Sequence, residues 1–405
     1  MKLNVSWKAG LMASVVCFVA LVACVAPAQP TVVPAKPPTA EPTRPPAKEA
    51  AKPSEKPAEK AAEKTAKAPE KPVEKAAEKP AAKVAMPPPL SPRVKVLVGD
   101  LQTSSDGPIY IALEKGFFRE QGLDVELSTF DASGKMIPAL SAGQIDIANS
   151  GTTVSLFNAF ARGIDIKAVA DHGRNNANHS AGSIGLRTDL VDRVKELKDL
   201  KGLKIALASR SGPSYAQLAK ALAKGGLTTK DVETVEMGFA DMLAALANKA
   251  VDAAMFTEPF GSQAVDRGLA VHWKRVHPDI YPDEQVGVLQ YGPQFAQRQP
   301  EAAKRFMIAY IKGIRVYLDA FDKKVGLDEV IDILTKYTTL KNPAVYRALP
   351  MAGFDRNGYI LVQHLIDDQE FFVTEGQIRP NEKADIGKMI DHSFVEYALS
   401  ILGKE

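Results

Sequence analysis

From Arg93 to the end of the chain, short runs of β-branched residues alternate with amphipathic segments of helical period. The first set predicts three strands and two helices, at residues 94–98, 108–117, 124–127, 135–142 and 145–148. The same order then returns, at residues 203–207, from 213 onward, 232–235, 240–247 and 251–254. Alternating strands and helices are typical of α/β folds. We therefore predict two similar α/β lobes.

The chain is expected to pass between these lobes twice. Residues 183–186 and 286–291 are apolar runs that each contain a glycine, which is a weak signal of a hinge strand. The resulting domains are lobe I, built from 93–185 and 290–405, and lobe II, built from 186–289.

The last hundred residues lack the strand pattern of the lobes. Apolar side chains such as Phe306, Ile311 and Ile333 recur there at helical spacing. This part is predicted to be a helical C-terminal extension that wraps lobe I.

The start of the chain has the layout of a secretory signal. Lys2 and Lys8 precede a short apolar run, Leu11 to Ala23, that is too short for a stable membrane span. Leu21-Val22-Ala23-Cys24 resembles the bacterial lipobox, so residues 1–24 are interpreted as a lipoprotein signal and Cys24 as the acylated anchor. The alternative is an ordinary signal in which Cys24 is only a small apolar residue.

Residues 25–92 are dominated by Pro, Ala, Lys and Glu and contain a near-repeat, at 55–64 and 70–79. These residues include few large apolar side chains, so burying them cannot offset the entropy lost when the chain is ordered. We predict a disordered tether that is anchored to the cell membrane through Cys24 and places the folded part outside the cytoplasm.

Composition excludes several kinds of chemistry. The only cysteines are Cys17 and Cys24, so the folded part has no thiol for a disulfide, a metal cluster or a nucleophile. Residues 1–92 hold 14 Lys and Arg and 8 Glu, which leaves 37 basic and 40 acidic residues, a net charge of −3, for residues 93–405. This balance gives no support for nucleic-acid binding.

His172 and His179 share one loop, but no cysteine or acidic cluster accompanies them. We therefore expect no metal and no cofactor. The sequence also has no phosphate loop and no Gly-x-Ser-x-Gly motif of a hydrolase.

Four segments carry a resemblance to a known family: 108–118, 122–127, 142–148 and 251–260. Together they resemble the periplasmic substrate-binding proteins of ABC importers, in the subgroup for nitrate, taurine, alkanesulfonate and thiamine-pyrimidine ligands. The resemblance implies the two-lobed periplasmic binding protein type II fold, a monomer that closes on a small solute, and a permease and ATPase as partners.

The resemblance further implies that the loops after the strands form the pocket, as in open α/β sheets generally. The implied ligand-binding residues are Ser105, Asp106, Asp131, Ser133, Ser150, Thr152, Ser209, Arg210, Ser211, Ser214, Tyr215, Phe239 and Glu258. Each Ser, Thr and Asp among them has an alternative role as a helix cap, because these residue types are preferred N-caps.

The aromatic residues have core packing as their alternative role. Arg210 would suit an anionic solute and Glu258 a heteroaromatic one with N–H groups, so both classes stay open. Two other functions stay open as well. One is an exported ligand sensor, and the other is a biosynthetic enzyme on the same fold. The related fungal thiamine-pyrimidine synthases carry a Cys-rich motif that is missing here after Cys24.

Overall fold

Lobe I is built on a mixed five-stranded sheet, in the order β2-β1-β3-β12-β4. A computed structural model describes residues 84–405 of the chain, and the strands of this sheet are β1 (Val94–Asp100), β2 (Leu123–Thr129), β3 (Ile147–Gly151), β4 (Lys167–Asp171) and β12 (Gly287–Tyr291). β1 pairs in parallel with β2 and β3, whereas β12 is antiparallel to β3 and β4. The three strands predicted for this lobe are thus confirmed.

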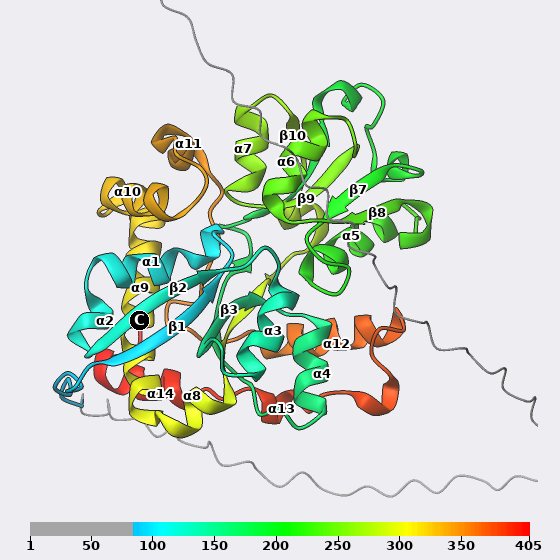
Figure 1. Ribbon diagram of the computed structural model, residues 1–405. Coiled ribbons are helices and arrows are strands. Elements are labelled where there is room, and N and C mark those ends of the chain that lie inside the picture. The colour runs from blue at the N-terminus through cyan, green and yellow to red at the C-terminus, as the bar shows by residue number, and fades with distance from the viewer. Residues whose placement is uncertain (1–83) are drawn as a thin grey trace, which may run out of the picture. The chain divides into compact units, whose positions relative to one another are not determined.

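Lobe II repeats the arrangement, in the order β10-β6-β9-β7-β8. Its strands are β6 (Gly182–Arg187), β7 (Lys204–Leu207), β8 (Glu233–Glu236), β9 (Ala253–Thr257) and β10 (Ala270–Arg275). β7 pairs in parallel with β8 and β9, just as β1 does with β2 and β3. The prediction of two similar α/β lobes is confirmed, and Figure 1 shows them as separate halves.

The helices pack on both faces of each sheet. In lobe I they are α1 (Gly107–Glu114), α2 (Phe117–Glu120), α3 (Ser133–Ser141), α4 (Val154–Ala161), α8 (Pro293–Arg298) and α9 (Pro300–Lys323). In lobe II they are α5 (Pro213–Lys224), α6 (Phe239–Ala247) and α7 (Phe260–Asp266). Val96 and Val98 of β1 pack against α1 and α9, and Leu97 packs against the core under α3 and α4, because successive strand residues point to opposite faces.

The chain crosses between the lobes at a small sheet of polar residues. β5 (Arg174–Asn175) pairs antiparallel with β11 (Glu284–Gln285). Residues 183–186, where the first crossing was expected, lie inside the lobe II sheet as β6, and residues 287–291 lie inside the lobe I sheet as β12. Apolar runs are typical of buried strands, so the hydrophobic pattern predicted the hinge at the strands next to it. The residues of the hinge itself are polar, and the pattern did not identify them.

The C-terminal extension consists of α10 (Leu327–Tyr337), α11 (Pro343–Ala348), α12 (Val362–Thr374), α13 (Ile386–Met389) and α14 (Ser393–Leu402). It packs on lobe I through α9 and α4, as expected. It also reaches lobe II: Glu375 accepts from Tyr215 at 2.7 Å, Gln377 donates to the Arg210 carbonyl at 3.0 Å, and the Thr339 carbonyl accepts from Gln263 at 3.2 Å.

The end of the expected tether is packed against lobe I. Leu90 donates its N–H to the Gln121 carbonyl at 3.2 Å, and Arg305 donates to the carbonyls of Pro87 and Pro88 at 3.0 and 2.6 Å. Residues 84–92 therefore belong with the folded part. Composition did not predict this, because it depends on hydrogen bonds from side chains far away in the sequence. The signal, Cys24 and residues 25–83 of the tether lie outside the described residues.

Candidate functional site

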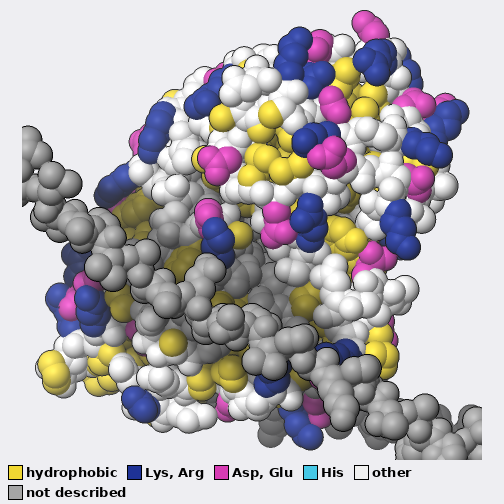
Figure 2. Space-filling view, turned by 45° about the vertical axis from the view of Figure 1, so that its right-hand side comes forward, with side chains coloured by type: hydrophobic (Ala, Val, Ile, Leu, Met, Phe, Trp, Pro, Cys, Tyr) yellow, Lys and Arg dark blue, Asp and Glu magenta, His cyan; other side chains and the backbone are white. Residues whose placement is uncertain are grey.

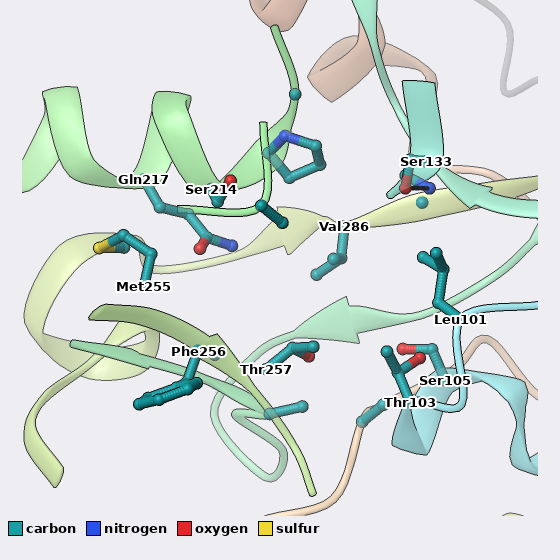
Figure 3. A pocket seen from close by; sticks show the side chains of 18 of the residues that line it. Leu101, Thr103, Ser105, Ser133, Ser214, Gln217, Met255, Phe256, Thr257 and Val286 are labelled. Atoms are coloured by element: carbon teal, nitrogen blue, oxygen red, sulfur yellow. Dashed lines mark hydrogen bonds between the residues drawn. The ribbon is translucent and has the colours of Figure 1, made fainter. Parts of the chain in front are cut away.

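The two lobes and the hinge enclose a cavity at the carboxyl ends of their parallel strands. It has a volume of about 80 Å³, which is room for several waters. Figure 3 shows Leu101, Thr103 and Ser105 on the lobe I side, Ser214, Gln217 and Met255 on the lobe II side, and Val286 between them. This is where open α/β sheets bind ligands.

The lobes are in contact across the cavity. Ser104, in the short helical turn Ser104–Asp106 just before α1, donates its N–H to the Glu258 carbonyl at 2.7 Å. Val154 at the start of α4 donates its N–H to the Ser211 carbonyl at 2.9 Å. A Cβ built on Gly151 would lie only 2.9 Å from Cγ of Pro213 in the other lobe. These contacts describe a closed arrangement.

The structure places five of the thirteen proposed ligand-binding residues at the cavity wall: Ser105, Ser133, Ser209, Ser214 and Phe239. Ser214 donates to the Ser209 carbonyl at 3.2 Å and Ser133 accepts from the Gly151 N–H at 3.0 Å, so part of their capacity is used by the protein. Phe239 stacks on Phe260 with ring centroids 5.1 Å apart.

Two more, Asp131 and Ser211, line a more open groove that continues from the cavity through Ser209. Asp131 forms an ion pair with Lys135 at 2.6 Å. Ser211 donates its N–H to the Ser209 hydroxyl at 3.1 Å.

Asp106, Ser150 and Thr152 are buried behind the cavity wall and do not line it. Asp106 accepts from the Thr103 N–H at 2.8 Å and from Asn149 at 2.8 Å, and its bond to Thr103 belongs to a capping box on the short helical turn Ser104–Asp106. Burial, with the charge of Asp100, raises the pKa of Asp106 to about 7. Ser150 accepts from Gln290 at 3.3 Å, and Thr152 donates to Asp368 at 2.7 Å.

Glu258 also caps a helix. It is fully buried and accepts from the Ser262 N–H of α7 at 3.0 Å and from Arg275 at 3.3 Å. Burial raises the pKa of this carboxyl. Next to Glu258, the ring of His272 forms hydrogen bonds with the hydroxyls of Ser183 and Ser262, at 3.0 and 3.1 Å. None of the side chains in this cluster lines the cavity.

Arg210 and Tyr215 point to other partners. The guanidinium of Arg210 donates to the Thr234 hydroxyl at 2.8 Å and carbonyl at 2.5 Å. Tyr215 packs on Phe371 with ring centroids 6.0 Å apart and donates to Glu375. Neither residue lines the cavity or the groove.

The cavity also contains polar residues that sequence reasoning missed. His172, Arg174 and Asn175 come from the end of β4 and the hinge, and Gln217 comes from the first turns of α5. The polar run from Asp171 to Asn176 between two apolar strands was the available signal, and the hydrophobic pattern gave it no weight.

A buried carboxylate of the hinge strand β11 ties these residues together. Glu284 accepts from Asn175 at 2.6 Å and from Gln217 at 2.9 Å, so it links the hinge to α5 of lobe II. Burial raises the pKa of Glu284 to about 7, against the opposing charge of His364 and the two amide hydrogen bonds.

Within residues 84–405 no group of three or more His, Cys, Asp or Glu side chains could hold a metal ion, and no helix is long and apolar enough to cross a membrane. On the face seen in Figure 2, Lys and Arg side chains are interspersed with Asp and Glu.

The fold and the enclosed cavity define a two-lobed protein of the periplasmic binding protein type. A family model described as NMT1/THI5 like matches residues 104–320, more than half of the chain. The chain therefore belongs to this family.

The comparisons with individual proteins agree. A "Putative binding protein" of Brucella abortus is 26% identical over 231 residues, which are 56% of this chain and 66% of the relative. The riboflavin-binding protein RibY of Chloroflexus aurantiacus is 24% identical over 233 residues, 57% of this chain and 62% of the relative. The chain thus spans slightly less than two thirds of these curated relatives.

Among solved structures, the periplasmic nitrate-binding protein NrtA of Synechocystis PCC 6803 superimposes with a TM-score of 0.66. It is 17% identical, and the match covers 77% of this chain and 89% of that protein. This likeness confirms the predicted fold class.

Proposed function

We propose that this protein is an extracytoplasmic, lipid-anchored solute-binding protein of an ABC importer, and that it captures a small polar or heteroaromatic solute between its lobes. The enclosed cavity carries the proposal, because loops of both lobes and the hinge line it together. Relatives named for nitrate and riboflavin binding support a small solute of this kind.

The mechanism follows from the geometry. A solute that touches both lobes adds its contacts only when the lobes meet, so it shifts the population toward the closed state. The bonds from Ser104 to Glu258 and from Val154 to Ser211 form at the same time. The narrow hinge at β5 and β11 would take up the motion, and the permease would recognise the closed state.

The function requires no covalent step. The chain would act as a monomer, with the permease and ATPase of the importer as its partners. A turnover assay on the bound solute separates this function from an enzyme on the same fold, since the binding protein returns the solute unchanged.

The experiment that tests the function begins with protein purified without denaturant. Mass spectrometry of the small molecules released on unfolding identifies the retained solute. The solute is then added with the protein to proteoliposomes that contain the permease and ATPase. We expect uptake that requires ATP and this protein. Tight binding without uptake would instead favour an exported sensor.

Anchoring has its own test, because Cys24 lies outside the described residues. Replacing the thiol in Cys24→Ser prevents acylation, so we expect the protein to leave the membrane fraction, whereas Cys17→Ser leaves it there. Equal membrane retention of the two variants would contradict the lipid anchor.

A further inference from the structure

The charge at the cavity wall is already neutralised. Among the described residues that line the cavity, Arg174 is the one Lys or Arg side chain, and no Asp or Glu lines it. Arg174 forms an ion pair with the fully buried Asp171 at 3.0 Å, lies 3.9 Å from Asp355, and donates to the Tyr359 carbonyl. The positive charge of Arg174 is therefore balanced within the protein and does not need a negatively charged solute.

His172 adds no charge either. It is buried at the wall, and Nδ1 has no hydrogen-bond partner in the described part of the chain. Burial lowers the pKa of His172 to about 3, with a hydrogen bond to the Ser105 backbone opposing. The imidazole is neutral near pH 7, so it brings no positive charge to the cavity wall.

The helix N-termini around the cavity could attract an anion through their free N–H groups. Several of these groups are already used by the protein. Ser104 and Val154 donate across the cleft to carbonyl oxygens, and Leu156 donates to the Thr153 hydroxyl. At α5, Pro213 has no N–H and Tyr215 donates to the Gly212 carbonyl.

The rest of the wall is mainly apolar, with Leu101, Pro213, Met255, Phe256 and Val286 from both lobes and the hinge. Hydroxyls and the amides of Asn175 and Gln217 interrupt it. Burying an ion in such surroundings without an opposite charge is costly, whereas a neutral polar group needs only its hydrogen bonds.

We propose that the cavity selects an uncharged solute with a flat or apolar body and a few hydrogen-bonding atoms over sulfonates and carboxylates. This inference rests on the proposed function and narrows its solute class.

The test compares matched probes of nearly the same size and shape, one with a neutral amide and the other with a charged carboxylate. Benzamide and benzoate form one pair, and nicotinamide and nicotinate another. Each is added to the full chain freed of retained solute, and affinities are measured by calorimetry near pH 7. We expect the neutral member of each pair to bind at least about tenfold more tightly.

A variant makes the test sharper. Asp171→Asn removes the main partner of the Arg174 charge, so it should shift the preference toward benzoate. The matched control is Asp252→Asn, since Asp252 pairs with Arg187 at 3.2 Å and does not line the cavity. If Asp171→Asn does not fold, the wild-type comparison decides alone.

The outcomes separate the two proposals. Tighter binding of the carboxylates by the wild-type chain overturns the inference of a neutral solute and leaves the proposed function standing, as does a retained solute that carries a permanent negative charge. Absence of any retained solute, together with no binding of any probe, counts against the proposed function itself.

Discussion

At the scale of single residues, the hydroxyls around the cavity differ in whether the protein already uses them. Thr103 donates to Asp106 at 2.9 Å, and Thr153 accepts from the Leu156 N–H at 3.3 Å. The hydroxyl of Thr257, at the end of β9, has no partner among the described residues and lines the cavity. A solute can therefore gain a new hydrogen bond at Thr257 without breaking an old one.

Thr257→Val keeps the shape of the side chain and removes only its hydroxyl. A net hydrogen bond contributes about 0.5–1.5 kcal/mol, so we expect the affinity for the retained solute to fall roughly 2- to 10-fold in calorimetry. Thr374→Val at the end of α12 is the control, because its hydroxyl bonds only the Glu370 carbonyl. Equal affinities of the two variants would contradict a contact at Thr257.

Glu284 makes stability depend on pH. Its pKa is raised on folding, from 4.5 to about 7, mainly by burial. A carboxyl of this kind stabilises the folded state below its unfolded pKa, and the contribution is lost as the pH rises through the folded pKa. His364, Asp368 and Tyr281 lie around the same carboxyl.

Glu284→Gln should therefore gain stability relative to the wild type between pH 5 and pH 8, by roughly 1–3 kcal/mol. Urea unfolding at each pH measures the difference. Glu301→Gln, which removes an exposed carboxylate, should show no such trend. Parallel pH profiles of the wild type and Glu284→Gln would show that the pKa is not shifted.

At the scale of elements, the end of β3 meets the start of α5 in the closed arrangement. Gly151 leaves the space that the ring of Pro213 fills, and its backbone does not have the positive φ that would itself require glycine. A side chain at this position would keep the two elements apart without straining β3.

Gly151→Ala is therefore expected to disfavour closure and to weaken solute binding by about tenfold or more, with little change in thermal stability. Gly387→Ala in α13 is the control, since a Cβ there lies 3.4 Å from its nearest neighbour, Asp385. Unchanged affinity in Gly151→Ala would mean that the contact is absent from the bound state.

At the scale of the whole molecule, closure should be visible in hydrogen exchange. The N–H groups of Ser104 and Val154 are bonded only when the lobes meet. Exchange of both amides should slow when the retained solute is added, while the central β1 amides, bonded within one sheet, should not change. If Ser104 and Val154 exchange equally fast with and without the solute, the hinge does not close on binding.

The α/β class, the repeated lobes and the helical extension could all be predicted from the pattern of apolar and polar residues. Hydrophobic period depends on local burial, so it can be read along the chain. Which loop residues face the cavity depends instead on how the lobes and the hinge pack together. Ser105 lines it, whereas the side chain of the adjacent Asp106 turns back to the Thr103 N–H in a capping box, although both residue types suit either role. One wall of the cavity is formed by His172, Arg174 and Gln217. They come together because of how the polar hinge folds, and no local sequence pattern predicts that they do.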